Sequence, residues 1–351
     1  MDSTGRRSDR RASEGRPLSV AVVGATGAVG EVLLDVLAER EFPLRELRLL
    51  ASGRSAGTYL SYGGREFRVR EARPEAFEGA DLVFFAATGD LSHTLAPEAV
   101  ARGAVVIDKS SSWRMSPAVP LVVPEVNPEA LDAHSGIVAC PNCTTIGVVM
   151  ALAPLQRIAG LERVVATTLQ AVSGAGRDGI EELEAQRSAR AGEAPAPSTF
   201  AAPIHDNVVP LCDALDDDGH AAEEIKLVHE TRKILDLASL PISVTCVRVP
   251  VAVGHSTSLL VSTTRPLDPA AAREALAAFP GVEVVDESRG DVVPTPADVV
   301  GRDTVVVGRV RSDTGGQGLA LFQVANNLRK GAATNAVQIA ETLIERGLLT
   351  R

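Results

Sequence analysis

The segment with the clearest capacity for chemistry reads CPNCTT over residues 140–145 and leads directly into an apolar helical stretch. A thiol at the start of a helix meets exposed backbone N–H groups and the positive end of the helix dipole. Both lower the pKa of a cysteine and favour the thiolate, which is the nucleophilic form. Cys143 is therefore a candidate nucleophile.

The remaining cysteines favour other interpretations. Cys140 and Cys143 have the spacing of a redox pair or of half a zinc site, but no second cysteine or histidine pair with metal-ligand spacing lies nearby. The sequence therefore predicts no metal site. We expect Cys140 to be a buried structural thiol and Cys212 and Cys246, in apolar or loop surroundings, to be inert. A disulfide between Cys140 and Cys143 under oxidation is a hypothesis.

A glycine-rich turn, GATGAVG, lies between a valine-rich run at 18–23 and a helical pattern. In such a turn glycines allow close backbone approach and aim exposed N–H groups at a pyrophosphate. The alternative is a turn that only packs a helix on a strand, but the strand–turn–helix setting favours nucleotide binding. The candidate cofactor residues here are Gly24, Ala25, Thr26, Gly27, Ala28, Val29 and Gly30.

The end of the expected second strand indicates which dinucleotide is bound. An enzyme for NAD presents a carboxylate there, whereas this chain has Ser52, Arg54 and Ser55. A guanidinium with two hydroxyls suits the 2′-phosphate of NADP. The alternative is an ordinary exposed arginine. Thr88 and Gly89, in the loop after the strand-like run 81–86, are weaker candidates for cofactor contact.

Composition excludes several classes of protein. The chain has 351 residues, of which 45% are hydrophobic and 23% charged, and this suits a globular protein of two domains. A net charge of -10 repels nucleic acid and anionic lipid. No apolar run is long enough to span a bilayer, and four cysteines are too few for a secreted disulfide framework. We expect a cytoplasmic protein that binds neither nucleic acid nor membrane, with a disordered tail at 1–17.

The order of apolar patterns predicts an α/β fold. Strand-like runs at 18–23, 47–50, 81–86 and 104–108 alternate with helical stretches, which predicts a doubly wound, Rossmann-type domain over 18–145. Longer runs at 161–172, 243–253 and 257–264 predict an α+β domain with a mixed sheet over 146–327. An amphipathic helix is expected at 328–349.

Five motifs occur in a characteristic order: GATGAVG, PNCTT, QAVSGAG at 170–176, EEIK at 223–226 and RVPVAVGHS at 248–256. In this combination the chain resembles the aspartate-semialdehyde dehydrogenases from about residue 18 onward. The resemblance implies that the C-terminal segment, 328–351, completes the first domain, and that the second domain provides both catalysis and dimerisation.

The resemblance also implies a role for each matching residue. Cys143 would form an acyl thioester, Gln170 would orient it, and His255 would be the general acid and base. Arg248 would hold the substrate carboxylate and Glu223 the substrate amino group. The remaining residues implied are Lys226 and Arg114 for phosphate, Asn142 for substrate, and Ser173, Gly174 and Asn326 for cofactor.

Each implied role has a plainer alternative. His255 or Arg248 alone would be an ordinary strand residue, and Arg114 could belong to a polar turn over Trp113. The implied activity is NADPH-dependent conversion of L-aspartyl 4-phosphate to L-aspartate 4-semialdehyde with release of phosphate, in a homodimer or homotetramer. Rival interpretations are a reductase of N-acetyl-glutamyl phosphate, a glyceraldehyde phosphate dehydrogenase and a non-catalytic binding module.

Overall fold

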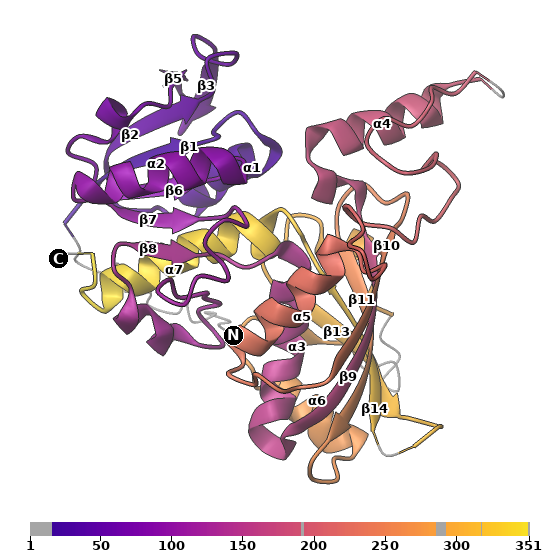
Figure 1. The fold of residues 1–351 in the computed structure, drawn as a ribbon. Coiled ribbons are helices and arrows are strands. Elements are labelled where there is room, and N and C mark those ends of the chain that lie inside the picture. The colour runs from indigo at the N-terminus through magenta and orange to yellow at the C-terminus, as the bar shows by residue number, and fades with distance from the viewer. Residues whose placement is uncertain (1–15, 191–192, 286–292, 317, 350–351) are drawn as a thin grey trace, which may run out of the picture.

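The computed structural model describes residues 16–190, 193–285, 293–316 and 318–349, and Figure 1 shows how they are arranged. Of the tail expected to be disordered, residues 1–17, all but the last two lie outside the described residues. Within the described ranges, no helix is both long and apolar enough to cross a membrane.

The first sheet is built from short, buried runs of valine, leucine and phenylalanine. Strands buried on both faces read as continuous apolar runs, because helices cover the sheet. Six strands pair in parallel in the order β5-β2-β1-β6-β7-β8. They are β1 (Leu18–Val23), β2 (Leu44–Ala51), β5 (Arg70–Glu71), β6 (Leu82–Phe85), β7 (Val105–Asp108) and β8 (Ile137–Ala139).

The strand order reverses between β1 and β6. In open parallel sheets ligands bind at such a switch point, beyond the carboxyl ends of the strands. Helices α1 (Ala28–Glu39) and α2 (Gly89–Ala101) begin at that edge, after β1 and β6. Helix α7 (Thr334–Glu345) returns from the far end of the chain to pack on α1 and β7. This part of the molecule is a Rossmann-like domain, as the sequence predicted.

The first domain also contains a small hairpin and two 3₁₀ turns. The hairpin strands pair antiparallel and lie above α1 and β2 in Figure 1. The elements are β3 (Tyr59–Tyr62), β4 (Arg65–Arg68), η1 (Pro74–Phe77) and η2 (Pro128–Ala133).

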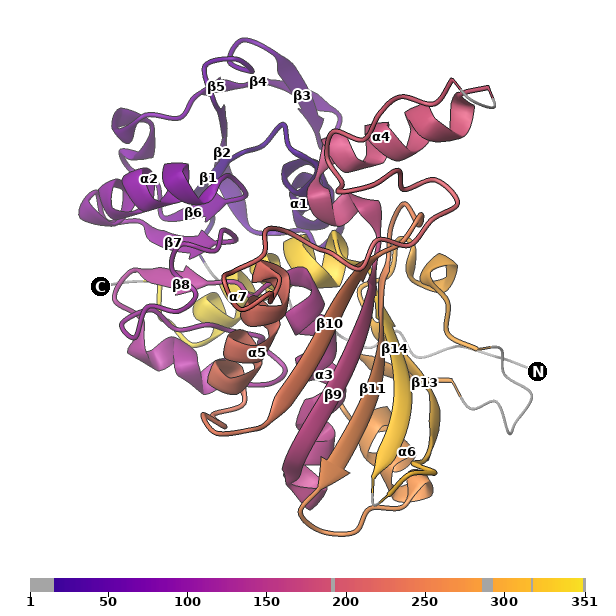
Figure 2. The same ribbon diagram turned by 45° about the vertical axis from the view of Figure 1, so that its right-hand side comes forward.

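The second sheet is mixed, with the order β10-β9-β11-β14-β13-β12. Two outer pairs are parallel and the inner pairs are antiparallel. Helices α3 (Cys143–Ala159), α5 (Ala222–Ile234) and α6 (Pro269–Ala277) pack against it, and Figure 2 shows α3 and α6 behind the strands. The strands are β9 (Leu161–Gln170), β10 (Ile242–Arg248), β11 (His255–Thr263), β12 (Val282–Val284), β13 (Val305–Ser312) and β14 (Leu319–Ala325).

Between β9 and α5 the chain forms an arm that projects from the second sheet (Figure 2). It contains the turn η3 (Val172–Ala175), the helix α4 (Arg177–Ser188) and a return loop. A small separate cluster of buried residues supports the arm, among them Val172, Leu183 and Ile204. The loop thereby comes to lie over the end of β10, where the site is found.

The largest differences from the predicted boundaries occur at two elements of the second half of the chain. The strand expected at 243–253 ends at Arg248, because Pro250 follows and has no N–H to donate to a ladder. The helix expected at 328–349 starts with a π-helical turn, η6 (Arg329–Ala333), before α7. Such turns are rare and often occur at functional sites. A final 3₁₀ turn, η5 (Pro296–Val299), lies before β13.

Candidate active site

Cys143 is the first residue of α3, which starts three residues before the apolar pattern near Ile146, so the thiol lies at the helix N-terminus as predicted. Asn142 caps the helix, and its side-chain oxygen accepts hydrogen bonds from the N–H groups of Thr144 at 2.8 Å and Thr145 at 3.4 Å. Most of α3 is buried, so its start is fixed by packing as well as by the cap. The thiol therefore stands at a rigid helix end that faces the first sheet.

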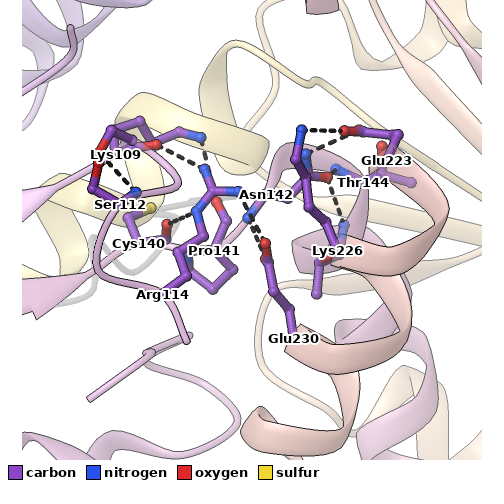
Figure 3. Close-up of polar contacts among 12 residues, drawn as sticks. Lys109, Ser112, Arg114, Cys140, Pro141, Asn142, Thr144, Glu223, Lys226 and Glu230 are labelled. Atoms are coloured by element: carbon purple, nitrogen blue, oxygen red, sulfur yellow. Dashed lines mark hydrogen bonds and ion pairs between the residues drawn. The ribbon is translucent and has the colours of Figure 1, made fainter. Parts of the chain in front are cut away.

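A buried ion pair holds the chain immediately before the thiol (Figure 3). The Glu230 carboxylate accepts from Arg114 Nη1 at 2.9 Å and from the N–H of Asn142 at 2.6 Å. Arg114 also donates to the carbonyl oxygens of Cys140 at 3.1 Å and Lys109 at 2.7 Å. Arg114 thereby holds the backbone of Lys109 and of residues 140–143, which we call the nucleophile segment; its expected binding of phosphate stays a prediction.

Glu223 lies about two turns before Glu230 on α5 and is buried. Its Oε1 accepts from Asn142 Nδ2 at 2.9 Å and from Gln170 Nε2 at 3.4 Å. Lys226 Nζ lies 3.5 Å from Glu223 Oε2 and donates to Asp213 at 2.6 Å. Four of the residues implied by the resemblance thus form one connected polar group.

Arg248 and His255 end β10 and begin β11, and the backbone of Ala171 connects them. The Ala171 carbonyl accepts from Arg248 Nη1 at 2.7 Å, and its N–H donates to His255 Nδ1 at 3.0 Å. Arg248 Nε and His255 Nε2 are buried, and neither has a hydrogen-bond partner among the described residues. Gly174 faces both side chains, since a Cβ there would lie 2.6 Å from Arg248 Nη1 and 3.0 Å from His255 Nε2.

The contact with Ala171 fixes the tautomer of His255. Because Nδ1 accepts a hydrogen bond, the neutral ring carries its proton on Nε2. Burial, and then the charges of Arg248 and Lys109, hold the pKa of His255 well below 6.5. The ring is therefore neutral near pH 7 and offers Nε2–H as a donor.

The expected effect on the pKa of Cys143 is wrong for the free enzyme. Burial and then the Glu223 carboxylate raise the pKa of the thiol, and the charges of Lys109, Arg114 and Arg248 only partly oppose them. Cys143 lies at the helix start as predicted, but desolvation raises the pKa of its thiol by more than the helix start lowers it. The other cysteines are buried, and burial raises the pKa of Cys212 to about 11.

A cavity of about 640 Å³ joins these residues. Arg114, Asn142, Glu223, Lys226 and Arg248 line it together with Cys143. Gln170 and His255 are each only 1% exposed and stand just behind its wall.

The arm contributes residues that sequence reasoning missed. Phe200 lines the cavity, and its ring centroid lies 5.7 Å from the guanidinium carbon of Arg248. Asp213, the partner of Lys226, opens the acidic run 213–218 in the return loop of the arm. No spacing rule signals such contacts, because they depend on how the arm folds back.

The glycine turn has the geometry that a pyrophosphate site needs. Gly24 has a φ of +83°, and a Cβ there would lie 2.2 Å from the carbonyl oxygen of Ala86. A Cβ on Gly30 would lie 2.1 Å from the carbonyl oxygen of Gly24. Only glycine fits at either position, and α1 starts at Ala28 with its N–H groups free for an anion. The residues present therefore fit a dinucleotide.

The other proposed cofactor residues lie in three places. Ser52 and Arg54 are exposed after β2 and Ser55 is half-buried, which leaves them accessible to a ribose phosphate. Thr88 is the N-cap residue of α2. Gly89 and Gly174 line the same cavity as Cys143, which brings the expected cofactor residues and the thiol together.

Two asparagines behind the site have structural partners. Asn326 donates to the Val299 carbonyl at 3.1 Å and accepts from the N–H groups of Leu328 and Arg329. Its neighbour Asn327, which sequence reasoning missed, pairs with Ser173 and accepts from the Gly254 N–H at 2.9 Å. Among the described residues, no cluster of histidine, cysteine or acidic side chains could hold a metal ion.

Comparison with known proteins agrees with this geometry. The family model for the NAD binding domain of semialdehyde dehydrogenases matches residues 19–134, and that for their dimerisation domain matches residues 152–330. Aspartate-semialdehyde dehydrogenase of Aquifex aeolicus is 48% identical over 336 residues, which are 94% of this chain and 99% of the relative.

Solved structures agree as well. Aspartate semialdehyde dehydrogenase II of Vibrio cholerae, complexed with ASA, has a TM-score of 0.91 at 44% identity, covering 94% of this chain and 99% of that one. The Candida albicans enzyme with NADP has a TM-score of 0.75 at 26% identity, covering 94% and 99%. The chain belongs to the aspartate-semialdehyde dehydrogenase family.

Proposed function

We propose that this chain reduces L-aspartyl 4-phosphate to L-aspartate 4-semialdehyde with NADPH and releases phosphate, in the biosynthesis of lysine, methionine, threonine and isoleucine. The observation that carries the proposal is the single cavity in which Cys143 meets an arginine, a carboxylate and a lysine suited to the substrate. The solved Vibrio cholerae relative, which is complexed with ASA, supports it.

The cavity offers a partner for each charged group of the substrate. Arg248 has a buried Nε with no partner among the described residues, and its planar fork suits the substrate carboxylate. Glu223 accepts the substrate ammonium. Lys226 and Arg114, with the amide of Asn142, hold the phosphate, for which Arg114 still has two N–H donors. Bound in this way, the substrate presents its acyl carbon to Cys143.

Covalent chemistry begins at the sulfur. The Cys143 thiolate attacks the acyl carbon, the C–O bond to phosphate breaks, and a thioester remains. When bound, NADPH supplies a hydride to the thioester carbon. His255 Nε2–H donates to the oxygen on which negative charge develops, and the thiolate of Cys143 leaves as the aldehyde forms. The fixed tautomer makes His255 a hydrogen-bond donor to this oxygen, and the proton stays on Nε2.

The first domain supplies the cofactor site of the proposal. The N–H groups at the start of α1, over residues 28–30, hold the pyrophosphate, and Arg54 with Ser52 and Ser55 holds the 2′-phosphate. We expect Arg54→Gln to weaken NADPH binding about tenfold and to leave NADH binding unchanged, since one charge-assisted contact is lost. Fluorescence titration with each cofactor measures this, and an equal loss for both would place the 2′-phosphate elsewhere.

The decisive test of the activity uses the reverse reaction. Wild-type protein should reduce NADP in the presence of aspartate semialdehyde and phosphate, with NAD as a poorer substitute. We expect Cys143→Ala to lose activity by at least about a thousandfold, because no thioester can form. A Cys143→Ala protein that turned over at the wild-type rate would favour a binding module over an enzyme.

The open face of the second sheet supports a homodimer. It carries half-buried apolar side chains from neighbouring strands, Leu169, Leu260 and Phe322, on the side away from α3. The matching family model is described as a dimerisation domain. We expect a dimer in light scattering, and a Leu260→Arg variant that is monomeric. A homotetramer would appear in the same experiment as twice the dimer mass.

The proposal includes the two domains and the cytoplasmic location that were expected from the sequence. The two family models end at 134 and begin at 152, which supports a division near 145 into segments 18–145 and 146–327. Helix α7 packs on β7, which supports adding the C-terminal segment to the first domain. Four free cysteines suit a reducing cytoplasm.

A further inference from the structure

Lys109 stands directly after β7, beside the nucleophile segment, and its role is not explained by the chemistry above. Its ammonium donates to the carbonyl oxygen of Pro141 at 3.3 Å, and its own carbonyl accepts from Arg114 at 2.7 Å. Figure 3 shows the Lys109 side chain lying next to the Arg114 guanidinium and Pro141. The side chain is half-buried, and within the described ranges no carboxylate forms an ion pair with it.

The other cations around the thiol are committed to partners. Arg114 is paired with Glu230 at 2.9 Å, and Lys226 is paired with Asp213 at 2.6 Å. Arg248 binds the substrate carboxylate in the proposed complex, and that carboxylate neutralises its charge. The charge of Lys109 is therefore the one near the thiol, among the described residues, that neither the protein nor the proposed substrate cancels.

We propose that Lys109 is a positioning residue that stabilises the thiolate of Cys143 by its unpaired ammonium charge, opposite the Glu223 carboxylate. The proposal rests on Cys143 being the nucleophile. The hydrogen bond to Pro141 anchors the ammonium two residues before the thiol, on the side of the first domain, whereas Glu223 approaches from α5. The two opposite charges thus act on the sulfur from different elements.

The charges that face Cys143 give the expected sign. Glu223 from α5 raises the pKa of the thiol, and Lys109 after β7, Arg114 in the following loop and Arg248 at the end of β10 lower it. Lys109 also helps to hold the pKa of His255 low. One cation therefore favours both forms that the chemistry requires, the thiolate and the neutral imidazole.

The test is the pH profile of Cys143 alkylation, which needs neither cofactor nor turnover. Wild type and variants are treated with iodoacetamide between about pH 6 and 10, spanning the usual range of thiol ionisation. Fragment mass spectrometry separates Cys143 from Cys140. We expect Lys109→Met to react about threefold to tenfold more slowly at neutral pH, because a smaller share of its Cys143 is thiolate. The rate plateau at high pH should not change.

Matched variants separate charge from structure. Lys109→Arg keeps the charge and should stay within about twofold of wild type, since a guanidinium replaces the ammonium. Lys109→Gln removes the charge but retains a donor, so it should follow Lys109→Met and serves if that variant does not fold. Lys233→Met is the control for loss of a nearby lysine charge. Lys233 donates to three backbone carbonyls and does not face the thiol, so this variant should leave the pH profile of alkylation unchanged.

An unchanged profile in both neutral variants would overturn the proposal, as would an equal shift in Lys109→Arg. Failure of the proposed function is a different result, namely full activity of Cys143→Ala, and the alkylation profile does not depend on it.

Discussion

Removal of Glu230 tests how firmly the nucleophile segment is held. Its side chain is 1% exposed, and both of its oxygens are used, one by Arg114 and one by the N–H of Asn142. Glu230→Ala leaves the guanidinium of Arg114, whose side chain is only 7% exposed, without a counter-charge. It also leaves a backbone N–H without an acceptor at the residue that caps α3.

The expected loss of stability in Glu230→Ala follows from the burial of the ion pair. Breaking a buried ion pair by removing one partner costs about 3–5 kcal/mol. An orphaned buried N–H costs about 1–3 kcal/mol, but the two losses share one site and do not add fully. We expect Glu230→Ala to lower the free energy of unfolding by about 4 kcal/mol. Glu230→Gln keeps the shape and one acceptor, so its loss should be about half as large.

Urea unfolding followed by circular dichroism measures the difference. Glu71→Ala is the control, because it removes one partner of an exposed pair, in which Glu71 and Arg73 are 42% and 67% exposed. That pair should contribute no more than about 1 kcal/mol. A loss below about 1 kcal/mol for Glu230→Ala would refute the claim that a desolvated pair anchors this segment.

Three further predictions concern the reacting groups. The pKa of His255 in the folded protein lies below the value of 6.5 in the unfolded chain, so at a pH between these two values the unfolded state binds more protons. The free energy of unfolding should therefore fall as the pH drops below about 6.5, by up to about 1.4 kcal/mol per pH unit. Urea titrations should show a shallower fall in His255→Asn. Gly174→Ala should lower kcat/KM by at least about a hundredfold, because its Cβ would displace the side chains of Arg248 and His255. Gly315→Ala is the control and should leave kcat/KM unchanged, since its Cβ would meet nothing closer than 3.7 Å. Glu223→Gln should speed alkylation of Cys143 at neutral pH, because a charge that raises its pKa is lost, and should raise KM for the semialdehyde.

Much of the first domain could be predicted because its signals are local. The turn at 24–30 is glycine-rich for steric reasons that one short segment contains, since Gly24 and Gly30 each approach a carbonyl oxygen too closely for a Cβ. The buried runs of β1, β6 and β7 are likewise continuous in sequence. The sequence of these segments therefore specifies both the fold and the place of the cofactor turn.

The electrostatics of the site could not be predicted, because they depend on residues far apart in sequence. The helix start at Cys143 was predicted, but burial of the thiol, and then the carboxylate of Glu223 on α5, reverse the expected shift of its pKa. The contact between Phe200 and Arg248 depends on the arm folding back over β10. Lys109 gives no sequence signal beyond its place after a parallel strand.

The raised pKa of the thiol has a consequence for the order of events. In the free enzyme burial, and then the charge of Glu223, raise the pKa of Cys143 and oppose formation of the thiolate. In the proposed complex the substrate ammonium binds Glu223 and cancels the second of these two causes, while the charge of Lys109 continues to act on the sulfur. Binding of the substrate amino group therefore removes one of the two causes that oppose the thiolate, which couples recognition of the substrate to activation of the nucleophile.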